Sequence, residues 1–262
     1  MPNRITQKFQ ELKESKKKAF IVFITAGDPN LKATRDLVLA LEKNGADIIE
    51  LGVPFSDPLA DGPTIQAASQ RSLKNNVNLN KILNLVAEIR KSSQIPIALM
   101  SYYNPIFKFG EKKFIEQAVS RGVDGVIVPD LPLEEGKELS LLAKRNGVVN
   151  ILFLSLTTTV KRMKRIVDAA SGFIYFVSLT GTTGARESIP LEVIQKIKAV
   201  KKLTDKPVCV GFGISTPEHV RLMNQAADGV IVGSAVVNQI HANAADSDLI
   251  SRVSDFVKNL KG

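Results

Sequence analysis

The segment at residues 50–66, ELGVPFSDPLADGPTIQ, contains carboxylic acids but no cation. Residues 44–70 include no Lys or Arg, although the whole chain has 35 among its 262 residues. A neighbouring Lys or Arg lowers the pKa of an acid, whereas burial without a cation raises it towards neutrality. A carboxyl group with a near-neutral pKa can both donate and accept a proton. The segment therefore predicts acid–base chemistry.

Glu50 and Asp61 are the candidate catalytic acids in this segment. If residues 47–52 form a strand, Ile48, Glu50 and Gly52 share one face, because side chains alternate along a strand. When that face is the inner one, the Glu50 carboxyl lies among apolar side chains. The spacing also leaves open a structural carboxylate at Glu50 that pairs with backbone, and a turn or helix-capping role for Asp61. For Asp57, in FSDP, a turn or surface role is favoured over catalysis.

The scarcity of histidine, and the lack of lysine in one expected strand, limit the types of reaction that the chain could catalyse. The two histidines, His219 and His241, are too few for an obvious histidine relay and argue against a zinc aldolase. The expected sixth strand, FIYFVS, has no lysine that could form a Schiff base with a carbonyl substrate. A carbon–carbon cleavage without a zinc ion or a Schiff-base lysine needs a substrate that can itself accept the electrons of the broken bond.

Three glycine-containing segments follow expected strands and could bind a phosphate. They are GTTGA at 181–185, GFGIS at 211–215 and GSA at 233–235. Glycine lets backbone N–H groups approach an anion closely, and a helix N-terminus adds about half a positive charge. Ser234 could add a hydroxyl donor. A tight turn explains any one of these glycines, but three such segments at adjacent strand ends predict a phosphate site.

The expected strands are short, apolar and rich in β-branched residues, which is typical of a parallel sheet covered on both faces. They are residues 20–25, 47–51, 95–101, 125–128, 149–154, 173–178, 207–210 and 229–232. Amphipathic segments such as NLNKILNLVAEIRKS lie between them and are expected to be helices. Eight strand–helix units predict one domain, residues 1–262, with the (β/α)8 (TIM) barrel fold of the α/β class.

A doubly wound open sheet is the alternative fold, but no GxGxxG motif follows the first strand. A short repeat favours the barrel, because DGVIV occurs at 124–128 and again at 228–232, in the fourth and eighth strands. The barrel is expected to have an N-terminal helix and extra helical elements in the loops after strands 2 and 8.

The bulk composition excludes several classes of protein. The net charge of +9 comes from Lys-rich helical surfaces without aromatic interleaving, so it indicates solvated surface and not nucleic-acid binding. No segment approaches the ~20 apolar residues of a membrane span, and no secretory signal is visible. The single cysteine, Cys209, lies in the apolar run KPVCVGFG and predicts a buried thiol. Together these features predict a cytoplasmic protein.

With these segments in hand, the chain closely resembles the tryptophan synthase α subunit family, essentially from end to end. The resemblance is carried by FITAGDPN, GADIIELGVPFSDPLADGPTIQ, LMSYYNPI, GVIVPDLP, SLTGTTGA, GFGIS and VGSA. It implies a (β/α)8 barrel that cleaves indole-3-glycerol phosphate into indole and D-glyceraldehyde 3-phosphate. It also implies a β-subunit partner in an α2β2 complex that uses pyridoxal phosphate to make tryptophan. No cofactor is expected in this chain.

The resemblance assigns roles to individual residues. The family's catalytic acids correspond to Glu50 and Asp61, and Asp57 corresponds to an acid near the β-subunit contact. The implied phosphate contacts are Gly184, Gly213, Gly233 and Ser234. The implied indole pocket consists of Phe23, Met100, Tyr102, Tyr175, Thr183 and Phe212, and no metal ligand is implied.

The implied reaction agrees with the scarcity of lysine and histidine, because protonated indole accepts the bond electrons itself. Glu50 would move protons between the glycerol hydroxyl and C3 of indole, and Asp61 would accept a hydrogen bond from the indole N–H. Two alternatives remain. One is a non-catalytic, phosphate-ligand-binding α-like subunit that only activates its partner. The other is a different phosphate-binding barrel such as an isomerase, which would leave PFSDPLADGPTIQ unexplained.

Overall fold

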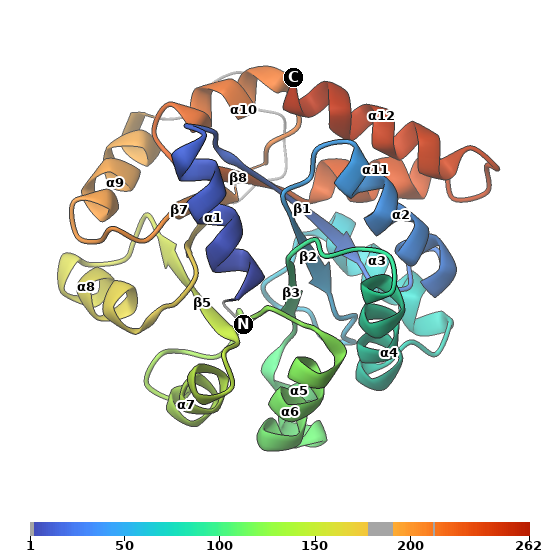
Figure 1. Ribbon diagram of the computed structural model, residues 1–262, viewed down its shortest axis with the longest axis horizontal. Helices are drawn as coiled ribbons and strands as arrows, with labels where there is room; N and C mark the ends of the chain where they lie inside the picture. The colour runs from blue at the N-terminus through green and yellow to red at the C-terminus, as the bar shows by residue number, and fades with distance from the viewer. Residues whose placement is uncertain (1–2, 178–190, 212) are drawn as a thin grey trace.

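Eight parallel strands close into a barrel in chain order, with β1 paired to both β2 and β8 (Figure 1). This computed structural model describes residues 3–177, 191–211 and 213–262. The strands are β1 Ala19–Thr25, β2 Ile48–Gly52, β3 Ile97–Met100, β4 Gly125–Ile127, β5 Val149–Ser155, β6 Ile174–Val177, β7 Val208–Gly211 and β8 Gly229–Val232. The predicted (β/α)8 barrel is confirmed.

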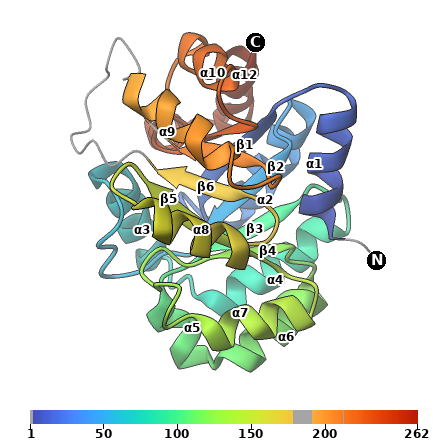
Figure 2. The same ribbon diagram turned by 90° about the vertical axis from the view of Figure 1, so that its left-hand side faces the viewer.

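The helices surround the barrel, and the described residues contain twelve of them (Figures 1 and 2). They are α1 Arg4–Glu14, α2 Leu31–Lys43, α3 Pro63–Lys74, α4 Leu79–Arg90, α5 Tyr103–Phe109, α6 Glu111–Arg121, α7 Lys137–Arg145, α8 Val160–Ala169, α9 Leu191–Lys201, α10 Pro217–Asn224, α11 Ser234–Ala242 and α12 Leu249–Lys261. The predicted N-terminal helix is α1, and the predicted extra helices are α3 after β2 and the pair α11 and α12 after β8. The short helix α5 was not predicted. None of the helices in the described part of the chain is long and apolar enough to cross a bilayer.

The side chains of each strand alternate between the barrel interior and the surrounding helices. On β1, Phe20, Val22 and Ile24 belong to the apolar cluster between strands and helices, whereas Ala19 and Ile21 belong to the interior cluster. This alternation decides which side chains reach the interior, and it continues along β1 to its C-terminal end.

Helix α1 closes the N-terminal end of the barrel (Figure 1). Its apolar residues Ile5, Phe9 and Leu12 join the interior cluster, and the Phe9 ring lies 5.5 Å from the Phe173 ring. Asn3 caps this helix by accepting a hydrogen bond from the N–H of Ile5. The opposite, C-terminal end of the strands is the end where barrel enzymes place their chemistry.

Four polar residues clasp neighbouring strands together at the N-terminal end. Asp47 donates its backbone N–H to the carbonyl of Phe20, and its carboxylate accepts the N–H of Phe20, both at 2.9 Å. The same two-way arrangement recurs at the starts of β4, β6 and β8, as Asp124–Ile97, Ser171–Asn150 and Asp228–Val208. The repeat DGVIV therefore has a physical basis, since its two aspartates occupy equivalent clasp positions.

Asp124 anchors the largest of these clasps. Its side chain is 3% exposed and pairs with Arg4 and with Arg90, each at 2.8 Å, in addition to the N–H of Ile97 at 2.9 Å. Arg90 is itself only 10% exposed. Removal of the carboxylate would therefore leave the Arg90 guanidinium buried without its counter-charge and the N–H of Ile97 buried without its acceptor, which is strongly unfavourable.

We expect Asp124→Ala to lower the free energy of unfolding by about 3–5 kcal/mol, the usual cost of breaking a buried ion pair from one side. Glu11→Ala is the matched control, because this carboxylate is 63% exposed and has Lys8 as its one ion-pair partner among the described residues. Such a surface pair contributes about 0–1 kcal/mol. Urea unfolding of both variants measures the difference. Equal destabilisation in the two variants would contradict the role given to Asp124.

Candidate active site

Glu50 lies in the middle of β2 and points into the barrel. It sits between Phe23 of β1 and Ala98 of β3 in the strand register, and it is 1% exposed. Neither of its carboxyl oxygens has a hydrogen-bond partner among the described residues. Burial, and secondly the nearby charge of Asp61, raise the pKa of Glu50 to about 8. At neutral pH this carboxyl is mostly protonated, as the cation-free sequence predicts.

Asp61 lies in the loop between β2 and α3, at the C-terminal end of the barrel. Its N–H donates to the carbonyl of Pro58, and its own carbonyl accepts the Gln66 side-chain amide at 2.9 Å. Burial raises the pKa of Asp61 to about 6, against a hydrogen bond from the Tyr102 side chain that lowers it. The carboxyl is therefore mostly ionised at neutral pH, in contrast to Glu50.

Tyr102 fixes the Asp61 loop from the side of β3. Its hydroxyl accepts the N–H of Ala60 at 2.9 Å, and its ring stacks on Phe55 with 5.3 Å between ring centroids. The phenol is 4% exposed. Burial and the charge of Asp61 raise the pKa of Tyr102 above its usual range, so the phenol stays protonated and can act as a donor to the carboxylate.

A small cavity brings Asp61 together with three residues of the predicted indole pocket. It is lined by Phe23, Thr25, Gly52, Val53, Asp61, Ile65, Ser69, Met100 and Tyr102. Its volume is about 10 Å³, which is room for about one water molecule. A Cβ atom at Gly52 would lie 2.6 Å from the Phe23 ring, so glycine is required there for the ring to approach β2.

Thr25 and Ser69, two further hydroxyl residues of this cavity, were not predicted from the sequence. A signal for Thr25 was available, because it follows Phe23 by two residues and therefore shares its inward face on β1. Ser69 is four residues after Ile65 on α3, so both lie on the same helix face. A hydroxyl at such a position carries no sequence pattern of its own.

Tyr175 occupies a neighbouring part of the interior. It lies on β6 with its ring 4.7 Å from the Phe153 ring and packs against the backbone at Gly211. Burial, followed by the charge of Glu50, raises the pKa of Tyr175 well above its ordinary value. Tyr175 is thus within electrostatic reach of Glu50, although it does not line the small cavity around Asp61.

Two of the predicted phosphate residues lie at the start of α11. Gly233 is the N-cap position and Ser234 is the exposed first residue of the helix. A Cβ atom at Gly233 would lie 3.5 Å from the Cβ of Phe23, which places this helix N-terminus beside the cavity. Gly213 follows β7, with a φ of +46° that favours glycine and open space around its Cα. The other predicted contacts, Gly184, Thr183 and Phe212, lie outside the described residues.

Asp57 lies in the same loop as Asp61 but faces solvent. Its carboxylate accepts a hydrogen bond from the Ser56 hydroxyl, and both residues are exposed. Leu59, two residues further, is 92% exposed. The structure therefore separates Asp57 from the acids of the barrel interior, as predicted for a surface position.

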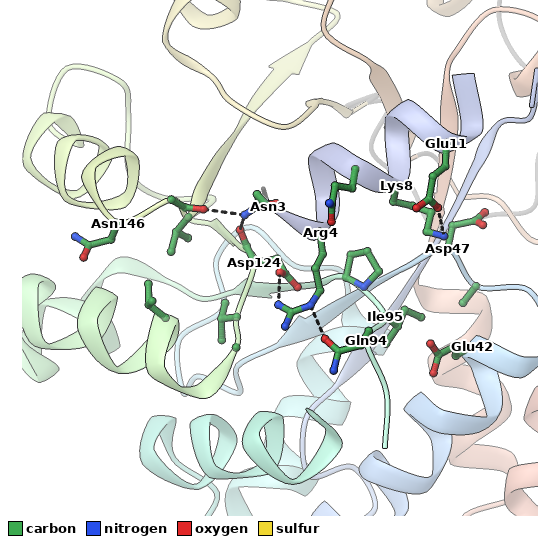
Figure 3. A pocket seen from close by; sticks show the side chains of 18 of the residues that line it. Asn3, Arg4, Lys8, Glu11, Glu42, Asp47, Gln94, Ile95, Asp124 and Asn146 are labelled. Atoms are coloured by element: carbon green, nitrogen blue, oxygen red, sulfur yellow. Dashed lines mark hydrogen bonds and ion pairs between the residues drawn. The ribbon is translucent and has the colours of Figure 1, made fainter. Parts of the chain in front are cut away.

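A large cavity lies at the opposite end of the barrel, around α1 (Figure 3). Its volume is about 920 Å³, and its lining includes Arg4, Lys8, Glu11 and Asp124. These charged groups pair with one another, as Arg4–Asp124 and Lys8–Glu11, each at 2.8 Å. None of the predicted site residues that the structure describes lines it. Glu50 and Asp61, and not this cavity around α1, therefore define the candidate active site.

A model of the tryptophan synthase alpha chain family matches residues 9–261. The chain is 48% identical over 259 residues to the tryptophan synthase alpha chain of Thermoanaerobacter sp. (strain X514), covering 99% of this chain and 98% of that one. This chain belongs to the tryptophan synthase alpha chain family. The predicted family is thereby confirmed, and with it the prediction of a lyase of tryptophan biosynthesis.

Solved structures of this family have the same fold. The tryptophan synthase subunit alpha of Legionella pneumophila str. Paris superposes with a TM-score of 0.92 at 38% identity, covering 99% of this chain and 97% of that one. A structure described as the tryptophan synthase a2b2 complex of Pyrococcus furiosus matches with a TM-score of 0.87 at 42% identity, covering 92% and 97%. Family membership therefore implies a tryptophan synthase partner.

The raised pKa of Glu50 predicts how stability depends on pH. Folding favours the protonated carboxyl, so this contribution is complete below about pH 4.5 and is lost as pH rises through about 8. The loss amounts to up to about 5 kcal/mol. In Glu50→Gln the group cannot ionise, so the variant should gain stability relative to wild type as pH rises from about 5 to 8.

Urea unfolding at several pH values measures this difference. Glu116→Gln is the control, because Glu116 lies exposed on α6, and its curve should follow that of wild type. If the curves of Glu50→Gln and wild type stay parallel across this range, Glu50 does not carry the buried proton.

Proposed function

We propose that this chain cleaves indole-3-glycerol phosphate into indole and D-glyceraldehyde 3-phosphate as the α subunit of tryptophan synthase. The observation that carries the proposal is a pair of carboxyls, buried Glu50 and half-buried Asp61, with different protonation states at neutral pH. Glu50 has a pKa of about 8 and Asp61 a pKa of about 6. When two titratable groups have different pKa values, one can act as the proton donor of a reaction while the other acts as the anion.

The proposed reaction needs a proton at one carbon and takes a proton from one hydroxyl. Protonated Glu50 donates to C3 of the indole ring, which becomes an iminium-like cation. The bond between C3 and the glycerol chain then breaks, and its electrons return to the ring. The glycerol hydroxyl on the leaving carbon loses its proton to Glu50 and becomes the aldehyde. Ionised Asp61 accepts the indole N–H and stabilises the ring cation.

The remaining predicted residues suit the two ends of this substrate. Phe23, Met100 and Tyr102 line the cavity of about 10 Å³ beside Asp61, which would widen to admit an indole ring. The N-terminus of α11, at Gly233 and Ser234, lies beside Phe23 and would bind the phosphate through backbone N–H groups and the helix dipole. We propose the same phosphate role for Gly213 and Gly184, and an indole-pocket role for Tyr175, Thr183 and Phe212.

We propose that the partner is a tryptophan synthase β subunit in an α2β2 complex, which receives indole and carries pyridoxal phosphate. The description of the Pyrococcus furiosus complex supports this stoichiometry. Asp57 and the 92% exposed Leu59 lie on the loop that also carries Asp61. A partner that covers this loop would therefore act directly on the catalytic machinery.

Indole release from indole-3-glycerol phosphate tests the proposal. The purified chain should release indole alone and at a higher rate with a β subunit, because the partner would order the Asp61 loop. A chain that binds the glycerol phosphate and stimulates its partner without releasing indole would instead be the non-catalytic α-like subunit. Absence of both binding and indole release would favour a different phosphate-binding barrel.

Variants of the two acids test their roles. Glu50→Gln keeps size and polarity but cannot exchange a proton, so kcat should fall by about 10²–10⁴-fold. Asp61→Asn keeps a hydrogen-bond acceptor but loses the charge opposite the indole cation, so it should be severely impaired while still binding substrate. Steady-state kinetics and melting temperatures of both variants decide between roles. A structural carboxylate would show the opposite pattern, with lower stability and nearly normal turnover.

A further inference from the structure

Thr25 is a buried hydroxyl residue whose side chain has no hydrogen-bond partner in the part of the chain that the structure describes. It is the last residue of β1, shares the inward face with Phe23, and is 2% exposed. Its Oγ1 atom has no hydrogen-bond partner among the described residues. An unpaired buried hydroxyl destabilises the folded state, and valine would fill the same volume without that cost. The hydroxyl at this position therefore indicates a partner that is present only when the site is in use.

The surroundings of Thr25 point to Asp61 as that partner. Both residues line the cavity of about 10 Å³, together with Ser69, which is 3% exposed on α3. Groups that line so small a space lie around one common point. The neighbour of Thr25 in the register of β2 is Gly52, so no side chain of that strand separates the hydroxyl from the loop that carries Asp61.

Catalysis requires the Asp61 carboxylate to stay ionised, and the titratable groups around it supply too few hydrogen-bond donors for this. The titratable groups that act on it are Glu50 from β2, Tyr102 from the loop after β3, and Tyr175 from β6. Among these, only Tyr102 donates a hydrogen bond that lowers the pKa of Asp61. An indole ring in the cavity would exclude water and raise that pKa further, which would neutralise the anion unless more donors are supplied.

We propose that Thr25, with Ser69 beside it, is a positioning residue that donates a hydrogen bond to the Asp61 carboxylate when the indole end of the ligand occupies the pocket. The hydroxyls take the place of the water that the ligand displaces, and they hold the carboxylate ionised and aimed at the indole N–H. This inference rests on the proposed function, and it concerns residues to which no role in the reaction was assigned above.

Thr25→Val tests the role of the hydroxyl at nearly constant shape. The acid limb of the kcat profile should move to higher pH by about one unit, because loss of a donor raises the pKa of Asp61 in the complex, and kcat reports pKa values of the complex. The loss of kcat should thus be about tenfold near pH 5 and smaller near pH 8. The melting temperature should stay the same or rise, since the hydroxyl has no partner among the described residues of the free protein. Thr25→Ser, which keeps a hydroxyl, should restore the wild-type profile.

Thr34→Val is the matched control for loss of a buried threonine hydroxyl. Thr34 is 0% exposed, and its hydroxyl accepts the N–H of Gly27 and donates to the carbonyl of Asn30, both at 2.9 Å. This variant should melt at a lower temperature and keep the wild-type acid limb. Ser69→Ala should shift the acid limb in the same direction as Thr25→Val.

A binding measurement separates failure of this inference from failure of the proposed function. The analogue indole-3-propanol phosphate lacks the hydroxyl needed for cleavage, so the pH dependence of its Kd reports on Asp61 without turnover. Thr25→Val should bind the analogue about tenfold more weakly than wild type near pH 8, where Asp61 is ionised, and the difference should shrink as pH falls and Asp61 becomes protonated. A wild-type chain that neither cleaves the substrate nor binds the analogue contradicts the proposed function. Normal wild-type activity with an unmoved acid limb in Thr25→Val, or a lowered melting temperature as its only effect, overturns the role of Thr25.

Discussion

An ionisable side chain held in the barrel interior, without a hydrogen-bond partner in the described part of the chain, is the constraint on which the rest of this structure depends. Burial is the main reason that Glu50 is protonated at neutral pH, and the charge of Asp61 is the second. The barrel supplies that environment, since Phe23 and Ala98 flank Glu50 in the sheet. The absence of Lys and Arg from residues 44–70 is the same constraint expressed in the sequence. Asp61 differs because it lies in a loop, where Tyr102 can reach it.

Most of the fold could be predicted because each strand has its own local signal. The apolar, β-branched runs marked all eight strands, and alternation from Ile48 correctly placed Glu50 inside. The expected third strand, 95–101, was too long, since Pro96 has no N–H to pair and β3 begins after it. Helix α5 was missed because its seven residues, YNPIFKF, include a proline and are too few for a helical period.

The sequence predicted only those site residues that stand in a recognisable sequence pattern. Glu50 and Asp61 stood out as acids in a cation-free segment, and the structure shows both with raised pKa values. Thr25 and Ser69 did not stand out, because a hydroxyl fits a strand or a helix as well as many other residues do. What distinguishes Thr25 is an unmet hydrogen bond, and that property exists only once every neighbour has been placed.

The four clasps at the N-terminal end also bear on how the barrel assembles during folding. Each clasp joins residues only 20 to 27 positions apart in the chain, whereas the closing pair of β1 and β8 joins Ala19 to Asp228. Closing a short loop costs less conformational entropy than closing a long one, and local contacts favour rapid folding. The clasped strand pairs are therefore suited to form first as separate units. The seam between β1 and β8 then closes last, on a sheet whose register is already set.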